Sequence, residues 1–174
     1  DILPDSILVD SLSKSAAMTG WRLGWCIVPA GMIPSVIAIH QTTVTCASVP
    51  AQRAALLVFG GAADEERREN LAELRRRRDL ALAGLKNRLS LPLIEPEGAF
   101  YIFLDVSSWK KDMGSSLDIA RALVSKAKVV TIPGIAFGRG GEGFLRLSFA
   151  GKPEAFAEEL DRIVSVIPNI PHET

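Results

Sequence analysis

Residues 11–25 read SLSKSAAMTGWRLGW, and this stretch guides the interpretation of the whole sequence. Lys14 and Arg22 are its only charged residues, and no acidic residue lies among them. Burial of unpaired charge is costly, so the stretch is either exposed or meets an anion that another molecule supplies. Hydroxyls at Ser11 and Ser13 can donate to phosphate oxygens, and a guanidinium grips phosphate through two hydrogen bonds. We therefore expect a phosphate-bearing cofactor.

The same stretch contains a lysine suited to covalent chemistry. A lysine amine that is partly desolvated near other cations loses some proton affinity, which a Schiff-base lysine needs. Gly20 and Gly24 allow a close backbone approach or a positive φ. The alternative interpretation is a surface loop in which a lysine and an arginine happen to lie near serines.

The pattern SxSKxxxxxGWRLGW resembles the pyridoxal-phosphate lysine motif of class I/II aminotransferases, the fold-type-I family that includes aspartate aminotransferases. The match includes a serine three residues before the lysine and an arginine eight residues after it. The resemblance implies that Lys14 binds pyridoxal 5′-phosphate covalently. It also implies that Arg22 and Ser11 hold the phosphate, with Ser13 as a further contact.

A second segment, PGIAFGRGGEGFLRLSFA at 133–150, resembles the C-terminal motif of the same family. In that motif the arginine binds the substrate α-carboxylate, so the resemblance assigns this role to Arg146. Arg146 alternates with Leu145, Leu147 and Phe149, so in a strand it faces away from them. Without the motif, an arginine on the solvent face of an edge strand is the simpler interpretation.

Two further segments are similar to family segments. GAFYIF at 98–103 implies that Gly98, Ala99 and Phe100 line the substrate entrance, although an ordinary core strand fits equally well. TTVTCASVPAQ at 42–52 occupies the place of a segment that reaches the neighbouring subunit's site in the family's homodimers. Residues 45–48 are the candidates for that contact, and a plain loop with a helix N-cap is the alternative.

Composition excludes several classes of protein. The 174 residues are 48% apolar and 23% charged with zero formal net charge, which is typical of a globular protein and gives no bulk attraction to nucleic acid. No run of about 18 apolar residues is present to span a membrane. Cys26 and Cys46 match no metal pattern, and we expect them to be buried thiols in a cytoplasmic protein.

Hydrophobic periodicity predicts a mixed order of elements. Strands are expected at 7–13, 21–29, 98–106, 129–133 and 144–150. Helices are expected from about Pro34, from Ser48 to Phe59, from Asp64 to about Leu89, after a capping box at Ser115 and Asp118, and from Pro153. The apolar run at 6–10 reads as a fully buried strand that needs partners on both sides.

The expected fold class is α/β. Residues 1–70 would form a partial segment of the three-layer PLP-transferase large domain, and residues 71–174 an α+β small domain. The chain would then be the C-terminal portion of a family member and would begin within a domain. Upstream family elements that contact the cofactor ring and phosphate are not in this sequence, which leaves catalysis by this chain alone open.

Three other patterns favour simpler interpretations. Gly138, Gly140 and Gly143 fit G-x-G-x-x-G, but an expected strand, not a helix, follows them. The run RRRR at 75–78 is surrounded by acidic residues, which favours a solvated helix with internal ion pairs. His40 and His172 have no neighbours at metal-ligand spacing, so no metal site is predicted.

The leading hypothesis is an aminotransferase that moves an amino group between an amino acid and a 2-oxo acid through pyridoxal phosphate on Lys14, as a homodimer without nucleic-acid or membrane partners. A pyridoxal-phosphate lyase or synthase of the same fold shares the lysine motif and remains an alternative. So do the aminotransferase-like effector domain of a transcription regulator and a non-catalytic fragment that dimerises through an exposed sheet.

Overall fold

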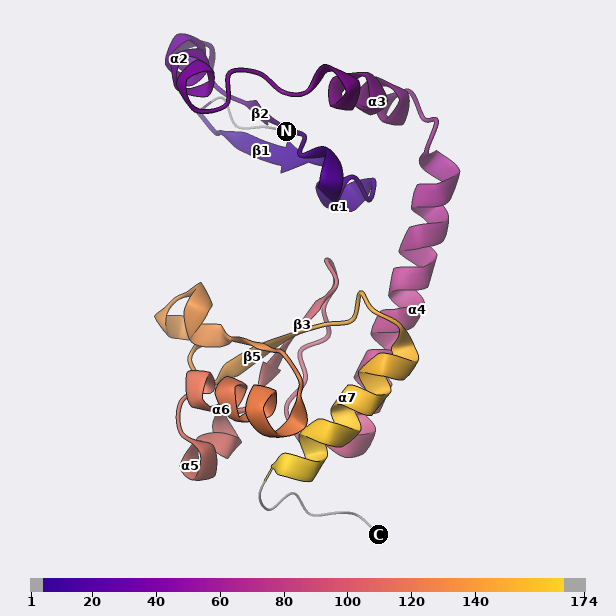
Figure 1. The fold of residues 1–174 in the computed structure, drawn as a ribbon, viewed down its shortest axis with the longest axis vertical. Coiled ribbons are helices and arrows are strands. Elements are labelled where there is room, and N and C mark those ends of the chain that lie inside the picture. Colours follow the sequence, from indigo (N-terminus) through magenta and orange to yellow (C-terminus); the bar gives the residue numbers. More distant parts are fainter. Residues whose placement is uncertain (1–4, 168–174) are drawn as a thin grey trace. The chain divides into compact units, whose positions relative to one another are not determined.

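A computed structural model describes residues 5–167 of the chain. The chain divides into two compact units, Asp1–Leu71 and Ala72–Thr174 (Figure 1). Helix α4 (Asp64–Arg88) begins in the first unit and continues in the second. Both units combine helices with antiparallel strands, which confirms the mixed α/β class predicted from the sequence.

Unit 1 is built around a two-stranded antiparallel sheet, β1–β2. Two helices, α2 and α3, follow the sheet along the chain, and each has a proline in its first turn, where no backbone N–H is required. The elements are β1 (Leu8–Ser11), α1 (Leu12–Ser15), η1 (Thr19–Trp21), β2 (Gly24–Ile27), η2 (Ala30–Met32), α2 (Ile33–Thr43) and α3 (Val49–Phe59).

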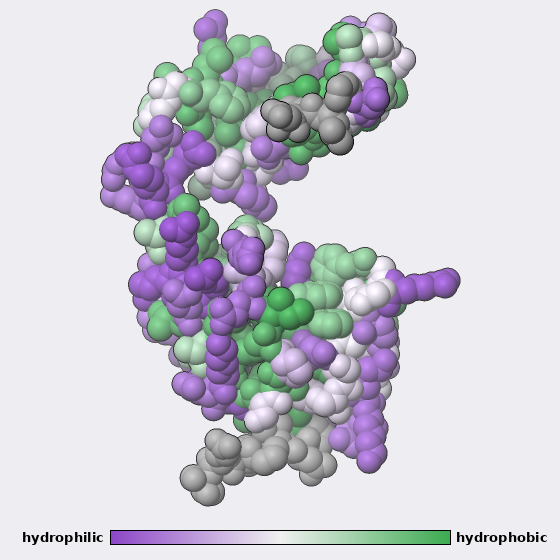
Figure 2. Space-filling model, turned by 180° about the vertical axis from the view of Figure 1, so that it is seen from behind, coloured by the Kyte–Doolittle hydropathy of each residue, from purple (hydrophilic) through white to green (hydrophobic). Residues whose placement is uncertain are grey.

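The core of unit 1 is small. Leu12, Met18 and Ala55 form its buried centre, so α3 packs against the segment that follows β1. Outside this centre, Ile7 and Val9 are 52% and 76% exposed. The prediction of a fully buried strand at 6–10 is therefore wrong, because β1 pairs only with β2 among the described residues. Figure 2 shows apolar side chains at the surface of this unit.

Unit 2 contains a three-stranded antiparallel sheet of order β3–β5–β4. Its α6 begins with the predicted capping box, in which the Ser115 hydroxyl and the Asp118 carboxylate satisfy each other's backbone N–H groups. The elements are β3 (Tyr101–Asp105), η3 (Ser107–Trp109), α5 (Lys110–Met113), α6 (Ser116–Ala122), η4 (Leu123–Ala127), β4 (Ile132–Pro133), η5 (Gly134–Phe137), η6 (Arg139–Gly141), β5 (Phe144–Ser148) and α7 (Pro153–Val166).

One face of this sheet forms the core of unit 2. Ile102 and Leu104 of β3 and Leu145 and Leu147 of β5 are buried against residues of α4, α6 and α7. The predicted apolar stripe of the last helix is confirmed, since its buried members are Phe156, Leu160 and Ile163. Strand periodicity places Tyr101, Phe103 and Arg146 on the opposite face.

The arginine run is part of a solvated helix, as predicted. Glu73 accepts hydrogen bonds from Arg76 and Arg77, and these lower the pKa of the Glu73 carboxyl to about 2. Arg78 pairs with the adjacent Asp79. Three of the four arginines of the run are therefore paired with acidic residues of the same helix.

Several strand limits differ from the predictions. Strand β2 begins at Gly24, three residues later than predicted, because Trp21 ends a 3₁₀ turn and Arg22 has φ +53°. Strand β4 begins only at Ile132, because the Val129 N–H donates to the Leu123 carbonyl. Both cysteines are exposed and unpaired, so their predicted burial is wrong. His172 lies outside the described residues.

No helix of residues 5–167 is long and apolar enough to cross a membrane. Within the same residues, no group of three or more His, Cys, Asp or Glu side chains is arranged to hold a metal ion. The segment after Gly138 leads through a 3₁₀ turn into strand β5, so the glycines at 138–143 lack the helix that a dinucleotide-binding loop requires.

Candidate active site

Three of the predicted site residues lie at the junction of β1 and α1. Ser11 is the N-cap of α1, and its hydroxyl oxygen accepts the Ser13 N–H at 3.4 Å. That bond uses an oxygen lone pair, so the Ser11 O–H remains able to donate. Lys14 follows on α1 and is exposed. The junction thus presents two hydroxyls and one ammonium within four consecutive residues.

Gly24 fits against this junction. The β1–β2 register pairs Ser11 with Gly24, so the start of β2 lies beside the N-cap of α1. A Cβ atom on Gly24 would lie 2.9 Å from the Asp10 carbonyl oxygen and 3.3 Å from the Ser11 Cβ. Glycine is therefore required here for a close backbone approach, which explains one glycine of the GWRLG run.

Arg22 has a left-handed backbone conformation just before β2. Its φ is +53° and its ψ is 44°, which is uncommon for a residue other than glycine. Ala17 has a positive φ as well, at 54°. Residues in strained backbone conformations persist only where the surrounding structure holds them in place. They are found most often at binding and active sites. Two such residues within six positions mark the segment that connects β1 to β2 (residues 12–23, called here the β1–β2 excursion) as a candidate site.

The Arg22 side chain is held by a carbonyl and not by an acid. Its Nη1 donates to the Thr19 carbonyl oxygen at 3.0 Å, and no ion pair within residues 5–167 involves it. A guanidinium has five N–H donors, so most remain for a ligand. Together with Lys14 and the hydroxyls of Ser11 and Ser13, this donor set fits a phosphate group.

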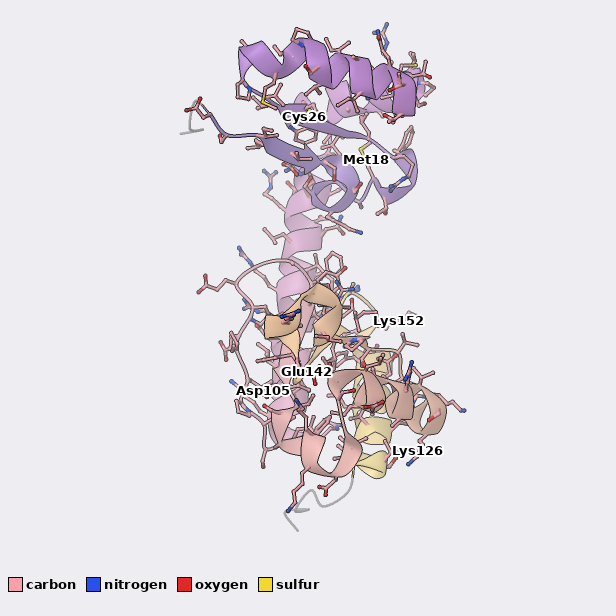
Figure 3. The ribbon with its side chains drawn as sticks, turned by 90° about the vertical axis from the view of Figure 1, so that its left-hand side faces the viewer. Met18, Cys26, Asp105, Lys126, Glu142 and Lys152 are labelled. Atoms are coloured by element: carbon pink, nitrogen blue, oxygen red, sulfur yellow. The ribbon has the colours of Figure 1, made fainter. Side chains whose placement is uncertain are left out.

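The excursion is anchored to the rest of unit 1 by its apolar residues. Leu12 and Met18 are 3% and 7% exposed and pack with Ala55 of α3 (Figure 3 labels Met18). The Met18 N–H also donates to the Leu12 carbonyl at 3.3 Å. Arg67 adds a hydrogen bond from its Nε to the Ser15 carbonyl at 3.2 Å. These contacts hold the polar residues in place without using their side chains.

Arg146 belongs to unit 2 and lies in the middle of the three-stranded sheet. Its register partners are Phe103 on β3 and Ile132 on β4. Leu145 and Leu147 are buried on the other face, which confirms the alternation predicted from the sequence. The Arg146 Cζ lies over the Tyr101 ring, 4.2 Å from its centroid, and over the Phe137 ring, 4.8 Å from its centroid.

The loop that carries Phe137 is closed by a backbone contact between two glycines. A Cβ on Gly134 would lie 2.0 Å from the Gly141 carbonyl oxygen, and one on Gly141 would lie 2.1 Å from the Gly134 carbonyl oxygen. No side chain fits at either position. The loop therefore requires Gly134 and Gly141, two of the four glycines in PGIAFGRGG.

Glu142 ties the same loop to the N-terminus of α6. Its carboxylate accepts the Ser116 N–H at 3.0 Å and the Ser116 O–H at 2.8 Å, and it pairs with Lys110 at 3.2 Å. These partners hold the pKa of the Glu142 carboxyl below its usual range, with the Ser116 N–H contributing most. Figure 3 labels Glu142, together with Asp105 at the end of β3.

The two less specific candidate segments have unusual backbone conformations. Ala99 has φ +59°, and Phe100 packs partly against the core of unit 2. Thr45 has φ +69°, and residues 45–47 line a pocket of about 720 Å³ in unit 1 together with residues of β2, α2 and α3.

Several residues described above, in one unit or the other, have no signature in the sequence. Tyr101 and Phe137 belong to the family-like segments, but nothing in their spacing indicates a ring contact with Arg146. Glu142 gives no local signal because its partner Ser116 lies 26 residues earlier in the chain. The strained Ala17 gives none either, since alanine rarely adopts a positive φ.

Comparison with known proteins relates this chain to one family. A family profile described as "Aminotransferase class I and II" matches residues 3–167. Aromatic-amino-acid aminotransferase 2 of Thermococcus litoralis is 36% identical over 167 residues, 93% of this chain. The valine–pyruvate aminotransferase of Mycobacterium tuberculosis is 39% identical over 168 residues, 95% of this chain.

Solved structures agree with the sequence comparison. The crystal structure of an aminotransferase from Mycobacterium tuberculosis superposes with a TM-score of 0.83 at 38% identity and covers 95% of this chain. The chain spans 41% and 42% of the lengths of the two sequence relatives, and 42% of the solved chain.

Proposed function

The chain belongs to the class I and II aminotransferases, and on that premise we propose that it forms the C-terminal portion of a pyridoxal-phosphate-dependent aminotransferase. The enzyme would transfer an amino group between an amino acid and a 2-oxo acid. The main support for the proposal is that Ser11, Ser13, Lys14 and Arg22, whose side chains are donors suited to phosphate, all lie between the end of β1 and the start of β2, where Ser11 pairs with Gly24.

The proposed domain assignment follows from the same motifs. Residues 1–70 would be a segment of the cofactor-binding large domain, and residues 71–174 the small domain with the carboxylate-binding arginine. In this assignment Lys14 is the catalytic and cofactor-binding lysine, Arg22, Ser11 and Ser13 bind the cofactor phosphate, and Arg146 binds substrate. We also propose a cytoplasmic homodimer, with small amino and 2-oxo acids as its ligands.

Each of the proposed site residues would have a separate role, which follows from its functional group. Pyridoxal phosphate, when bound, supplies an electron sink that stabilises negative charge at the substrate α-carbon. Arg22 would hold the phosphate through its guanidinium, and the Ser11 and Ser13 hydroxyls would donate to the remaining oxygens. Lys14 would bind the cofactor through Nζ and, once displaced by substrate, would take and return the α-carbon proton as a general base and acid.

Arg146 would orient the substrate by its α-carboxylate. The planar fork of a guanidinium matches a carboxylate through two parallel hydrogen bonds, which fixes direction as well as distance. Because every amino acid has this carboxylate, Arg146 would not discriminate between substrates by their side chains. The relatives named above act on different amino acids according to their names, so the proposal extends to amino acids as a class.

Product analysis of the full-length protein tests the proposal against its main alternative. With an amino acid and a 2-oxo acid together, a transaminase produces a new amino acid and a new 2-oxo acid in equal amounts. Release of ammonia without any 2-oxo acid acceptor would identify a lyase of the same fold and overturn the proposal. Absence of both reactions, with cofactor bound, would favour a non-catalytic effector domain.

A further inference from the structure

The aromatic rings beside Arg146 form a defined group. Tyr101 lies at the start of β3, opposite Ser148, and Phe137 ends the 3₁₀ turn η5. Both rings face the Arg146 guanidinium, with centroids 4.2 Å and 4.8 Å from Cζ. Both distances are within the range of about 6 Å over which a ring face attracts a cation.

We infer that Tyr101 and Phe137 are positioning residues, which hold the Arg146 guanidinium in the orientation that binds the substrate α-carboxylate. This inference rests on the proposed role of Arg146. It assigns to the two rings a part in substrate recognition that neither the family match nor the lysine motif supplies. Their contribution would be to keep a long, flexible side chain in one rotamer before substrate arrives, which reduces the entropy lost on binding.

Ring contacts suit this task better than an ion pair would. Within residues 5–167, the Arg146 side chain makes no salt bridge and no hydrogen bond with the protein. An acidic neighbour would occupy the same N–H donors that a substrate carboxylate needs. A ring face attracts the cation without accepting those hydrogen bonds, so the guanidinium is oriented while its donors stay available.

The rings themselves are held by separate parts of unit 2. Tyr101 is fixed by the β3–β5 ladder, and its ring lies 4.4 Å from that of Phe100. Phe137 packs edge-on against Phe103 at 6.0 Å, and its loop is closed by the contact of Gly134 with Gly141. Because each ring has contacts other than Arg146, each can act as a support for it.

Two ligands that differ only by a carboxylate test the inference in the full-length, cofactor-loaded protein. 2-Aminoisobutyrate has an α-amino group and a carboxylate but no α-hydrogen, and isopropylamine is the same amine without the carboxylate. Dissociation constants are measured from the change in cofactor absorbance. Tyr101→Leu and Phe137→Leu should each raise the dissociation constant of 2-aminoisobutyrate by about 3- to 30-fold and leave that of isopropylamine unchanged.

Matched variants separate the ring face from general packing. Tyr101→Phe and Phe137→Tyr keep the ring and should bind 2-aminoisobutyrate within about 2-fold of the unmodified protein. Phe144→Leu removes a ring that lies on the same strand face and stacks on Phe103 at 4.9 Å, whereas the rings under the Arg146 guanidinium within residues 5–167 are those of Tyr101 and Phe137. It should also leave 2-aminoisobutyrate binding unchanged.

The outcomes distinguish this inference from the proposed function. If Arg146→Ala weakens the binding of 2-aminoisobutyrate alone, and the leucine variants bind it normally, the positioning role is wrong and the proposed role of Arg146 stands. If the leucine variants weaken the binding of both ligands equally, the rings are structural and the inference is again wrong. If Arg146→Ala affects both ligands equally or neither, the proposed carboxylate site itself fails, and the inference fails with it.

Discussion

Ser11 and Gly24 lie directly opposite each other in the β1–β2 ladder, and this pairing sets the N-cap of α1 beside the start of β2. It brings the lysine and the arginine of one short sequence segment into a single excursion of the chain. The arrangement depends on the missing Cβ of Gly24. The proposed phosphate site therefore depends on one strand register as well as on neighbouring residues in the sequence.

Gly24→Ala should disturb this excursion. The new Cβ would lie 2.9 Å from the Asp10 carbonyl oxygen, a contact that the backbone must move to relieve. We expect a loss of about 1–3 kcal/mol in stability and a weaker affinity for pyridoxal phosphate. Gly31→Ala is the control, since a methyl group there would meet no atom within 4 Å, and it should change neither quantity. Urea unfolding and cofactor titration check both expectations.

Gly134→Ala should separate the two sides of the loop around Phe137. A methyl group there would lie 2.0 Å from the Gly141 carbonyl oxygen, so the loop has to open. We expect unit 2 to lose at least about 3 kcal/mol of stability and amino-acid affinity to fall as Phe137 moves. Gly140→Ala meets no atom within 4 Å and serves as the control. Equal melting temperatures for the two variants would contradict the closed-loop description.

Glu142 should make stability depend on acidic pH. Its pKa is lowered in the folded chain by the Ser116 N–H, the Ser116 hydroxyl and Lys110. A carboxyl with a lowered pKa stabilises the fold above its unfolded pKa of about 4.3, and this stabilisation is lost as pH falls through the folded value. The stability difference between the unmodified protein and Glu142→Gln should therefore shrink between pH 7 and pH 3.

The control for this pH dependence is Glu97→Gln, which changes an exposed residue that has no ion pair within residues 5–167. The difference in stability between Glu97→Gln and the unmodified protein should stay small from pH 7 to pH 3. Urea unfolding at pH 7, 5, 4 and 3 measures both series. A Glu142→Gln difference that is constant across this range would show that the Ser116 and Lys110 contacts do not stabilise the charged form.

Arg146→Ala should weaken amino-acid binding far more than cofactor binding. Loss of a buried, hydrogen-bonded charge partner costs about 2–5 kcal/mol, whereas the cofactor is held by residues of unit 1 in our proposal. Arg146→Lys should recover only part of the affinity, because an ammonium lacks the guanidinium fork. Arg139→Ala removes an exposed cation from the same loop region and should have little effect. Equal losses of amino-acid and cofactor affinity would indicate a structural role for Arg146.

Regular elements were predictable where local chemistry defines them. The capping box at Ser115 and Asp118 satisfies backbone donors within one turn, so its sequence signature is sufficient. The long helix α4 ends at Arg88, one residue before the predicted end, and its ion pairs include Glu73 with Arg77 at i,i+4 spacing. The inward and outward alternation around Arg146 follows from the period of a strand alone.

Features that depend on distant segments were not predictable. Arg22 reads as part of a strand by composition, but its left-handed conformation follows from the turn that returns the chain to β1. The exposure of Cys26 and Val9 depends on which surfaces cover β1 and β2, which no local pattern specifies. The rings over Arg146 come from β3 and η5, and only the packed sheet brings them together.

The most direct test of the central claim is to locate the covalent attachment of the cofactor. The full-length protein is incubated with pyridoxal 5′-phosphate, reduced with borohydride, digested and mapped by mass spectrometry. Our account predicts one stoichiometric adduct, on the peptide that contains Lys14, and its loss in Lys14→Ala. An adduct on another lysine, such as Lys126 or Lys152, or a stoichiometric adduct that persists in Lys14→Ala, would contradict it.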